Sequence, residues 1–229
     1  MLRLDSAEPS VIASELGISA QSVSESLSRL GLPETTAVPD DRVVDAVVRL
    51  VGSRGGLERL SRPLRWNLFE LLVGRIMEAA GLRVWRGVVL SHSGRRVQID
   101  LVGAAATSVY VVECKRWLRS FTEGLALREA ARHRERARVL ASVIGGAGLT
   151  GPHRTYIVPV VVALYSRPMT LDSFVTPPRT LLSLIREHPA ALPSPPTISL
   201  ATSTQPIEVL ERMFASRRLG DRRQQHIDI

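Results

Sequence analysis

The stretch SVYVVECKRW (108–117) is the feature that most limits how this chain can fold. Its β-branched and aromatic residues are typical of an interior β-strand, yet it also carries Glu113 and Lys115. Residues two apart on a strand share a face, so these two side chains point the same way and Cys114 points to the other face. A buried carboxylate or ammonium is costly unless it is paired, bound to a metal or solvated. The fold must therefore place a polar site beside this strand.

Lys115 is the only lysine among 30 basic residues, and the other 29 are arginine. An ammonium is compact and can reach a single water molecule, whereas a guanidinium is a planar fork that always stays charged. The single lysine therefore indicates a task that arginine cannot perform. The alternatives are a structural Glu–Lys pair at a strand end and the chance survival of one lysine.

A second carboxylate, Asp100, ends the apolar segment VQID (97–100). A short loop joins the strand expected at 97–103 to the strand at 108–117, so the two are expected to pair antiparallel. Asp100 and Glu113 would then converge on one hard cation through oxygen ligands. Lys115 would lie beside the metal-bound water, where it would lower the pKa of that water or orient it for attack on a phosphate.

The pattern of the remaining chain predicts alternating helices and strands. Helices are expected at 66–81, with Gly81 as the terminating glycine, at 121–146, and as short segments at 171–175 and 179–188. Strands are expected at 82–91, 97–103 and 108–117, at 155–166 as a central buried strand, and at 195–200 as an edge strand. The order α-β-β-β-α-β predicts an α/β fold with a mixed central sheet flanked by helices. The basic tail from Arg217 is expected to be frayed.

The N-terminal segment 6–33 is expected to form two helices joined by the turn GIS, with Ser19 capping the second helix. This arrangement resembles a helix-turn-helix of the winged-helix kind, whose second helix would present Gln21 and Arg29 to DNA. The alternative is a helical hairpin used for packing or dimerisation. We expect a small winged-helix-like domain at 1–60, the main domain at 61–202, and a C-terminal helix with a basic tail at 203–229.

The net charge of +8 and the pI of about 11 favour an anionic partner, with nucleic acid first and a membrane surface second. With 45% hydrophobic residues the chain is able to bury a core, and a single cysteine excludes a disulfide framework. Neither a signal-peptide apolar region nor an apolar run of about 18 residues is present. We therefore expect a cytoplasmic protein without a membrane span.

Arginines gather at two further places. Arg95 and Arg96 lie in the turn expected at 91–96, and a stripe at helical spacing runs along the helix at 121–146; its members are Arg128, Arg132 and Arg136. Such a stripe suits a DNA backbone. Glu129 and Glu135 on the same helix leave open a second interpretation, a solvated face of ion pairs.

The segments FELLVGRIMEAAGLRVWR, VQIDLVG and VYVVECKRW together resemble the PD-(D/E)xK nuclease superfamily, especially Mrr-like restriction endonucleases and archaeal Holliday-junction resolvases. The resemblance covers roughly residues 65–165. Its motif residues fall on Glu70, Asp100, Glu113 and Lys115. One departure is that Asp100 follows "QI", where the family often has "G-x" or a proline.

The resemblance implies a restriction-endonuclease-like fold and Mg²⁺- or Mn²⁺-dependent hydrolysis of DNA phosphodiesters. Asp100 and Glu113 would bind the metal, Glu70 would reach it directly or through water, and Lys115 would assist the attacking water. Family analogy implies a homodimer, because cutting two strands usually takes two sites. The expected function is a DNA endonuclease, restriction-like or junction-resolving. The alternative is a non-catalytic DNA-binding or scaffolding protein on a nuclease fold.

Overall fold

The computed structural model describes residues 13, 19–29, 66–92, 94–116, 122–146, 151–187, 195–215 and 225–227. The chain forms two compact units, residues 1–75 and 76–229. Most of the first helix of the expected helix-turn-helix and the domain boundary expected at residue 60 lie outside the described residues. Within the described part, no helix is both long and apolar enough to cross a membrane.

In the first unit, helix α2 (Ala20–Arg29) begins where the sequence predicts. The backbone N–H of Ser22 donates to Oγ of Ser19 at 3.1 Å, which is the expected N-cap interaction. Gln21 is exposed and donates to Glu25 at 3.2 Å, one turn further along the helix. The cap confirms the predicted start of this helix.

Helix α5 (Trp66–Ala79) begins in the first unit and ends in the second. It stops at Gly81, whose φ of 87° is the left-handed conformation that glycine adopts without strain. The N–H of Gly81 donates to the carbonyl of Glu78 at 2.9 Å, and the N–H of Leu82 donates to that of Met77 at 3.1 Å. This pair of bonds is a Schellman motif, so the predicted terminating glycine is confirmed.

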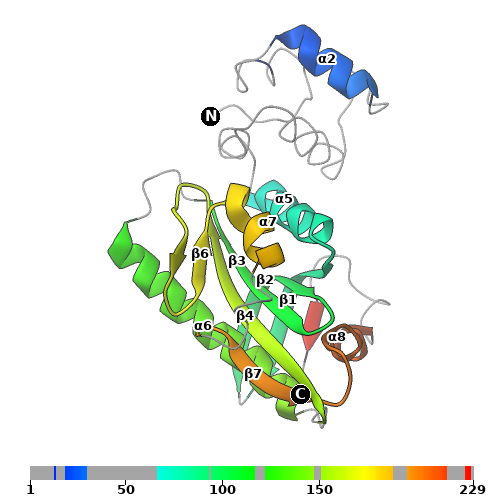
Figure 1. Cartoon of the computed structure of the whole chain (residues 1–229), viewed down its shortest axis with the longest axis vertical. Coiled ribbons are helices and arrows are strands. Elements are labelled where there is room, and N and C mark those ends of the chain that lie inside the picture. The colour runs from blue at the N-terminus through cyan, green and yellow to red at the C-terminus, as the bar shows by residue number, and fades with distance from the viewer. Residues whose placement is uncertain are drawn as a thin grey trace. The chain divides into compact units, whose positions relative to one another are not determined.

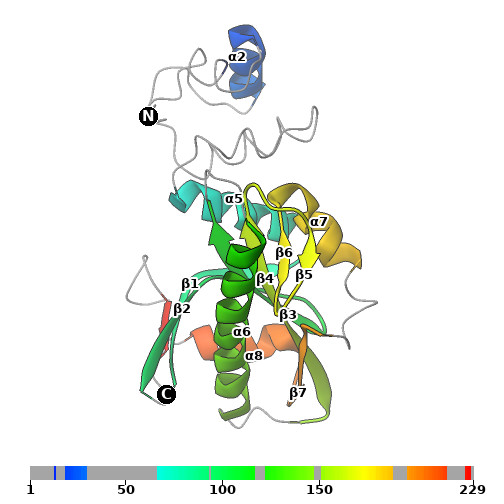
Figure 2. The ribbon, with the colours of Figure 1, turned by 90° about the vertical axis from the view of Figure 1, so that its left-hand side faces the viewer.

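The second unit is built on a mixed eight-stranded sheet in the order β5-β6-β4-β3-β2-β1-β8, with β7 also paired to β4 (Figures 1 and 2). Its strands are β1 (Arg83–His92), β2 (Arg95–Ala104), β3 (Ser108–Lys115), β4 (His153–Ala163), β5 (Met169–Thr170), β6 (Phe174–Thr176), β7 (Ile198–Thr202) and β8 (Gln225–Ile227). Strands β1, β2 and β3 pair antiparallel, and β3 pairs parallel with β4. The predicted antiparallel hairpin, the central strand and the mixed α/β class are confirmed.

Parallel pairing of β3 and β4 requires a crossover, and α6 (Glu123–Gly146) provides it along one face of the sheet (Figure 2). Leu140 and Ile144 of α6 share a buried core with the strands and with Val209 and Phe214 of α8 (Pro206–Ala215). Helix α7 (Pro178–Glu187) contacts β3 through a hydrogen bond from the Tyr110 hydroxyl to the carbonyl of Ile185 at 3.2 Å. Tyr110 and Val111 are neighbours on β3 and point to opposite faces, so helices flank the sheet on both sides.

Three sequence expectations differ from the structure. The turn expected at 91–96 is shorter, because β1 extends to His92 and β2 begins at Arg95, so Arg95 and Arg96 lie on a strand. The short helix expected at 171–175 is wrong, because Phe174–Thr176 forms β6 and pairs parallel with β4. Val175 and Thr176 are β-branched and favour a strand, and the edge of β4 supplies the backbone hydrogen bonds that pair with it. At the C-terminus, where fraying is expected, the backbone of Gln225–Ile227 pairs with β1.

Gly151 is required where the chain enters β4 beside the end of β7. A Cβ at this position would lie 2.5 Å from Cα of Ser203 and 2.8 Å from the carbonyl oxygen of Thr202, and backbone atoms cannot move aside cheaply. Gly151→Ala should lower the free energy of unfolding by about 1 to 3 kcal/mol in urea titrations. Gly124→Ala is the matched control, because a Cβ there meets nothing within 4 Å. An equal loss in both variants would contradict the close approach.

Candidate active site

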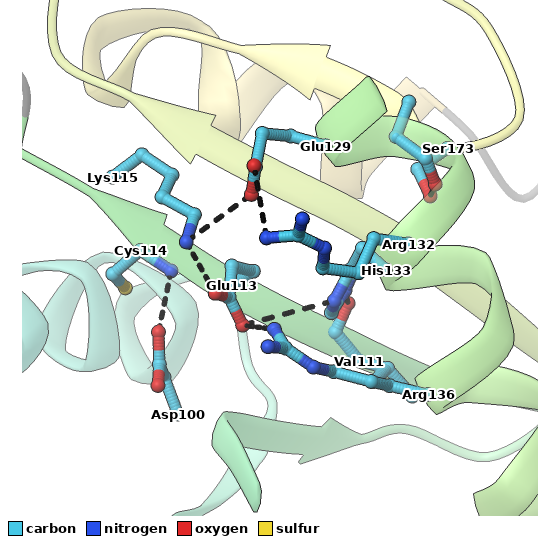
Figure 3. Close-up of polar contacts among 11 residues, drawn as sticks. Asp100, Val111, Glu113, Cys114, Lys115, Glu129, Arg132, His133, Arg136 and Ser173 are labelled. Atoms are coloured by element: carbon cyan, nitrogen blue, oxygen red, sulfur yellow. Dashed lines mark hydrogen bonds and ion pairs between the residues drawn. The ribbon is translucent and has the colours of Figure 1, made fainter. Parts of the chain in front are cut away.

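The structure places Asp100, Glu113 and Lys115 where the pairing of β2 with β3 ends, with Asp100 in the middle of β2 and Lys115 as the last residue of β3 (Figure 3). The β2–β3 pairing ends at Leu101↔Val112, so the next position along both strands places Asp100 beside Glu113. The N–H of Cys114 donates to Oδ2 of Asp100 at 2.8 Å. A carboxylate thus continues the ladder where the backbone pairing stops. The hairpin thus places the two acids at neighbouring positions, and their convergence on one cation stays a prediction.

A local twist in the sheet accompanies this change. Gly87, with φ of 59°, stands opposite Asp100 in the β1–β2 register, between the pairs Arg86↔Leu101 and Val88↔Ile99. On β1, Trp85 and Val88 reach the same core although they are three residues apart, which regular alternation would not allow. The alternation of side chains between the two faces is therefore interrupted at Gly87, opposite the position where Asp100 lacks a backbone pair.

Glu113 is only 5% exposed, and both of its carboxylate oxygens are bound by cations. Oε1 accepts a hydrogen bond from Nζ of Lys115 at 2.7 Å, and Oε2 accepts one from Nη1 of Arg136. Burial alone would raise the pKa of Glu113, but the bonds from Lys115 and Arg136 outweigh it and hold the pKa below its ordinary value. Glu113 is therefore ionised at neutral pH.

Lys115 is held between two carboxylates. Besides Glu113, it pairs with Oε2 of Glu129 on α6 at 3.2 Å. Burial alone would lower the pKa of Lys115, but these two partners raise it above its ordinary value. Glu129 is itself 7% exposed and also accepts a bond from Arg132 at 3.4 Å. The ammonium is therefore charged and fixed in position.

Helix α6 supplies three side chains to this cluster that the sequence analysis did not assign to it: Glu129, His133 and Arg136. They recur at i, i+4 and i+7, which is one face of a helix. The face was hidden because the apolar residues buried beside these side chains are the alanines Ala126, Ala130 and Ala137, which give little hydrophobic contrast. An acid and a histidine in line with those alanines were the available signal.

His133 is fully enclosed, with 1% exposure. Its Nε2 donates to the carbonyl of Val111 at 2.8 Å, and its Nδ1 lies 3.9 Å from Oε2 of Glu113 without a hydrogen-bond partner among the described residues. Burial lowers the pKa of His133 to about 4, so the ring is neutral at pH 7. A neutral ring here packs α6 on β3 and adds no charge to the cluster.

Asp100 has the opposite electrostatic situation from Glu113. Burial, together with the negative charge of Glu113, raises the pKa of Asp100 to about 6, and the bond from Cys114 offsets this only in part. Two carboxylates at neighbouring positions therefore repel each other near neutral pH. Among the described residues, no group of three or more His, Cys, Asp or Glu side chains is placed to hold a metal ion.

The other predicted site residues are spread over both units. Glu70 lies on the part of α5 that belongs to the first unit, and its metal role stays a prediction. On α6, Arg128 is exposed, Arg132 is 65% exposed, and Arg136 turns toward Glu113. Gln21 on α2 and Arg96 on β2 are exposed, whereas the side chains of Arg29 and Arg95 lie outside the described part.

Comparisons with protein-family models, with curated proteins and with solved structures found no match to this chain.

The raised pKa of Asp100 predicts that its neutral isostere stabilises the protein. The folded protein binds the proton of Asp100 more tightly than the unfolded chain, so the stability from that proton is full below about pH 4 and is lost as the pH rises through about 6. Asp100→Asn removes this loss and keeps an acceptor for Cys114. At pH 7.5 the variant should be more stable by at most about 3 kcal/mol, and the gain should vanish near pH 4.

Denaturant titrations across pH 4 to 8 would measure this difference. Asp172→Asn is the matched control, because it removes an exposed aspartate that pairs with Arg134 at 3.0 Å. That variant should be unchanged or slightly less stable. A destabilised Asp100→Asn at pH 7.5 would show that the ionised carboxylate strengthens the fold instead.

Proposed function

We propose that this chain is a divalent-metal-dependent deoxyribonuclease with a restriction-endonuclease-like core. The observation that carries the proposal is the grouping of Asp100, Glu113 and a charged Lys115 where the pairing of the interior strands β2 and β3 ends. The element order α5-β1-β2-β3-α6-β4 supports the same proposal, since it matches the order expected from the sequence. The sole lysine of an arginine-rich chain lies at this point.

The residues present fit a hard cation. Asp100 and Glu113 are neighbouring carboxylates whose repulsion contributes to the raised pKa of Asp100, and a cation bound by both would relieve it. Mg²⁺ is commonly held by one or two carboxylates, with water and substrate phosphate as the remaining ligands. Two protein carboxylates are therefore sufficient when a phosphodiester is bound.

The geometry supports a role for each of these residues. A bound Mg²⁺ or Mn²⁺ would activate a water molecule and offset the charge that develops on the phosphate. Asp100 and Glu113 would hold it, and Lys115 would donate a hydrogen bond to the attacking water or to a phosphate oxygen. Glu129 fixes the ammonium in position for that bond, so it acts on the reaction through Lys115. Glu70 is kept as a proposed additional ligand.

DNA is the proposed substrate because the chain carries a net charge of +8, and because Arg128 and Arg132 are exposed on the helix that lines the site. Helix α2, with its exposed Gln21, would hold DNA in the first unit. The proposal includes a restriction-like or junction-resolving endonuclease, a homodimer and a cytoplasmic location.

One observation favours a second candidate function. Both oxygens of Glu113 are already neutralised by Lys115 and Arg136, as in a purely structural ion-pair cluster. A chain of this kind would bind DNA on a nuclease fold without cutting it.

A cleavage experiment separates the two functions. Labelled four-way junction, linear duplex and single-stranded DNA would be incubated with the protein and Mg²⁺, Mn²⁺ or EDTA. We expect metal-dependent cleavage that falls by at least about 100-fold in Lys115→Ala and in Asp100→Asn. Glu135→Gln is the control, because Glu135 is 64% exposed and pairs with Arg138 away from Lys115. DNA binding without cleavage, unchanged in both site variants, would support the second function.

The pKa of Asp100 also predicts how metal binding depends on pH. A carboxylate must be ionised to bind a metal, and Asp100 is half protonated at about pH 6. The affinity for Mn²⁺, measured by titration calorimetry without DNA, should be constant above pH 7 and fall about tenfold per pH unit well below pH 6. An affinity that stays constant down to pH 5 would exclude Asp100 as a ligand.

A further inference from the structure

Arg136 occupies one of the two oxygens that the proposed metal site needs. Its guanidinium donates to Oε2 of Glu113, while Lys115 binds Oε1 of the same carboxylate (Figure 3). A cation held by Glu113 must therefore share the carboxylate with these two groups or replace one of them. Like charges repel strongly at such short range in a partly buried site.

Arg136 is the partner that yields more easily. Lys115 is anchored by a second carboxylate, Glu129, and its side chain is 17% exposed. Arg136 makes a single ion pair among the described residues, the one with Glu113, and the Arg136 side chain is 27% exposed. The guanidinium can therefore turn outward without leaving another buried carboxylate unpaired.

The outward direction leads to the basic edge of α6. Arg132 lies one turn before Arg136 and is 65% exposed, and Arg128 lies one turn earlier and is exposed as well. A guanidinium donates two parallel hydrogen bonds and matches the oxygens of a phosphate. A phosphodiester placed at Asp100 and Glu113 would lie next to Arg136, within the reach of a long side chain.

We infer that Arg136 is a catalytic residue that exchanges partners: it neutralises Glu113 until a divalent cation takes that carboxylate, and it then binds the scissile phosphodiester. This inference rests on the proposed nuclease function. Arg136 makes and breaks no covalent bond in this role. It donates hydrogen bonds to the phosphate oxygens, whose negative charge must be balanced while the P–O bond breaks.

The exchange predicts that one variant binds the metal more tightly but cleaves DNA more slowly. Arg136→Gln removes the competitor for Glu113, so the affinity for Mn²⁺ without DNA should rise about fivefold or more. The same variant loses the phosphate contact, so kcat for DNA cleavage should fall about 100-fold. Arg136→Lys keeps a competing cation and loses the planar fork, so Mn²⁺ affinity should stay near that of the unchanged protein while kcat falls.

Free Mn²⁺ would be measured by electron paramagnetic resonance, and cleavage under single-turnover conditions. Arg138→Gln is the charge-matched control, because Arg138 lies on the same helix, is 53% exposed and pairs with Glu135. It should leave both quantities within about twofold. Circular dichroism and melting curves would verify that the variants fold, and Arg136→Lys supplies the comparison if Arg136→Gln does not.

The outcomes distinguish this inference from the function on which it rests. Metal binding and cleavage that are both unaltered by Arg136→Gln, or Mn²⁺ affinity that falls with kcat, would overturn the exchange and leave the nuclease intact. Unaltered kcat in Arg136→Lys would overturn the phosphate contact. A protein that binds no Mn²⁺ and cuts no DNA would overturn both the exchange and the nuclease.

Discussion

The buried carboxylate of Glu113 is the charge around which the second unit is organised. It lies on an interior strand, and its ionised form persists only because Lys115 and Arg136 bind its two oxygens. Arg136 belongs to α6, so the ion pair that keeps Glu113 charged also joins the crossover helix to the sheet. Replacing a buried ion pair piecemeal is strongly destabilising, because the remaining charge is left uncompensated. The packing of α6 on β3 and the charge of Glu113 therefore depend on the same contacts.

Helix α6 serves the fold and the site with different parts of its length. Leu140 and Ile144, near its C-terminal end, pack into the core shared with α8. The segment from Glu129 to Arg136 carries charged and polar side chains to β3 instead. A helix that must connect β3 to β4 necessarily passes over both strands. The chain thus brings extra functional groups to the strand end without an additional element.

The sequence was sufficient for features that depend on local chemistry. Ser19 marks a helix start because its hydroxyl accepts a bond from a terminal backbone N–H. Gly81 marks a helix end because it adopts the left-handed conformation in which the following N–H groups reach the last carbonyls. Strand alternation places Glu113 and Lys115 on one face. The short loop of the β2–β3 hairpin was enough to bring in Asp100. The position of Arg136 was not predictable in this way, because the rotation of an alanine-rich helix is decided by tertiary contacts. The strand at Phe174–Thr176 likewise depends on a tertiary contact, its pairing with β4.

In the hydrogen bond from Cys114, the Asp100 carboxylate takes the place that a backbone carbonyl would have in a regular strand pair. A chain without a charge at this position would still need an acceptor for the part-buried N–H of Cys114. Asparagine would meet that need, whereas alanine would not. Asparagine at position 100 would therefore preserve the local backbone even without a charge, while a small apolar residue there would leave the N–H of Cys114 without this acceptor.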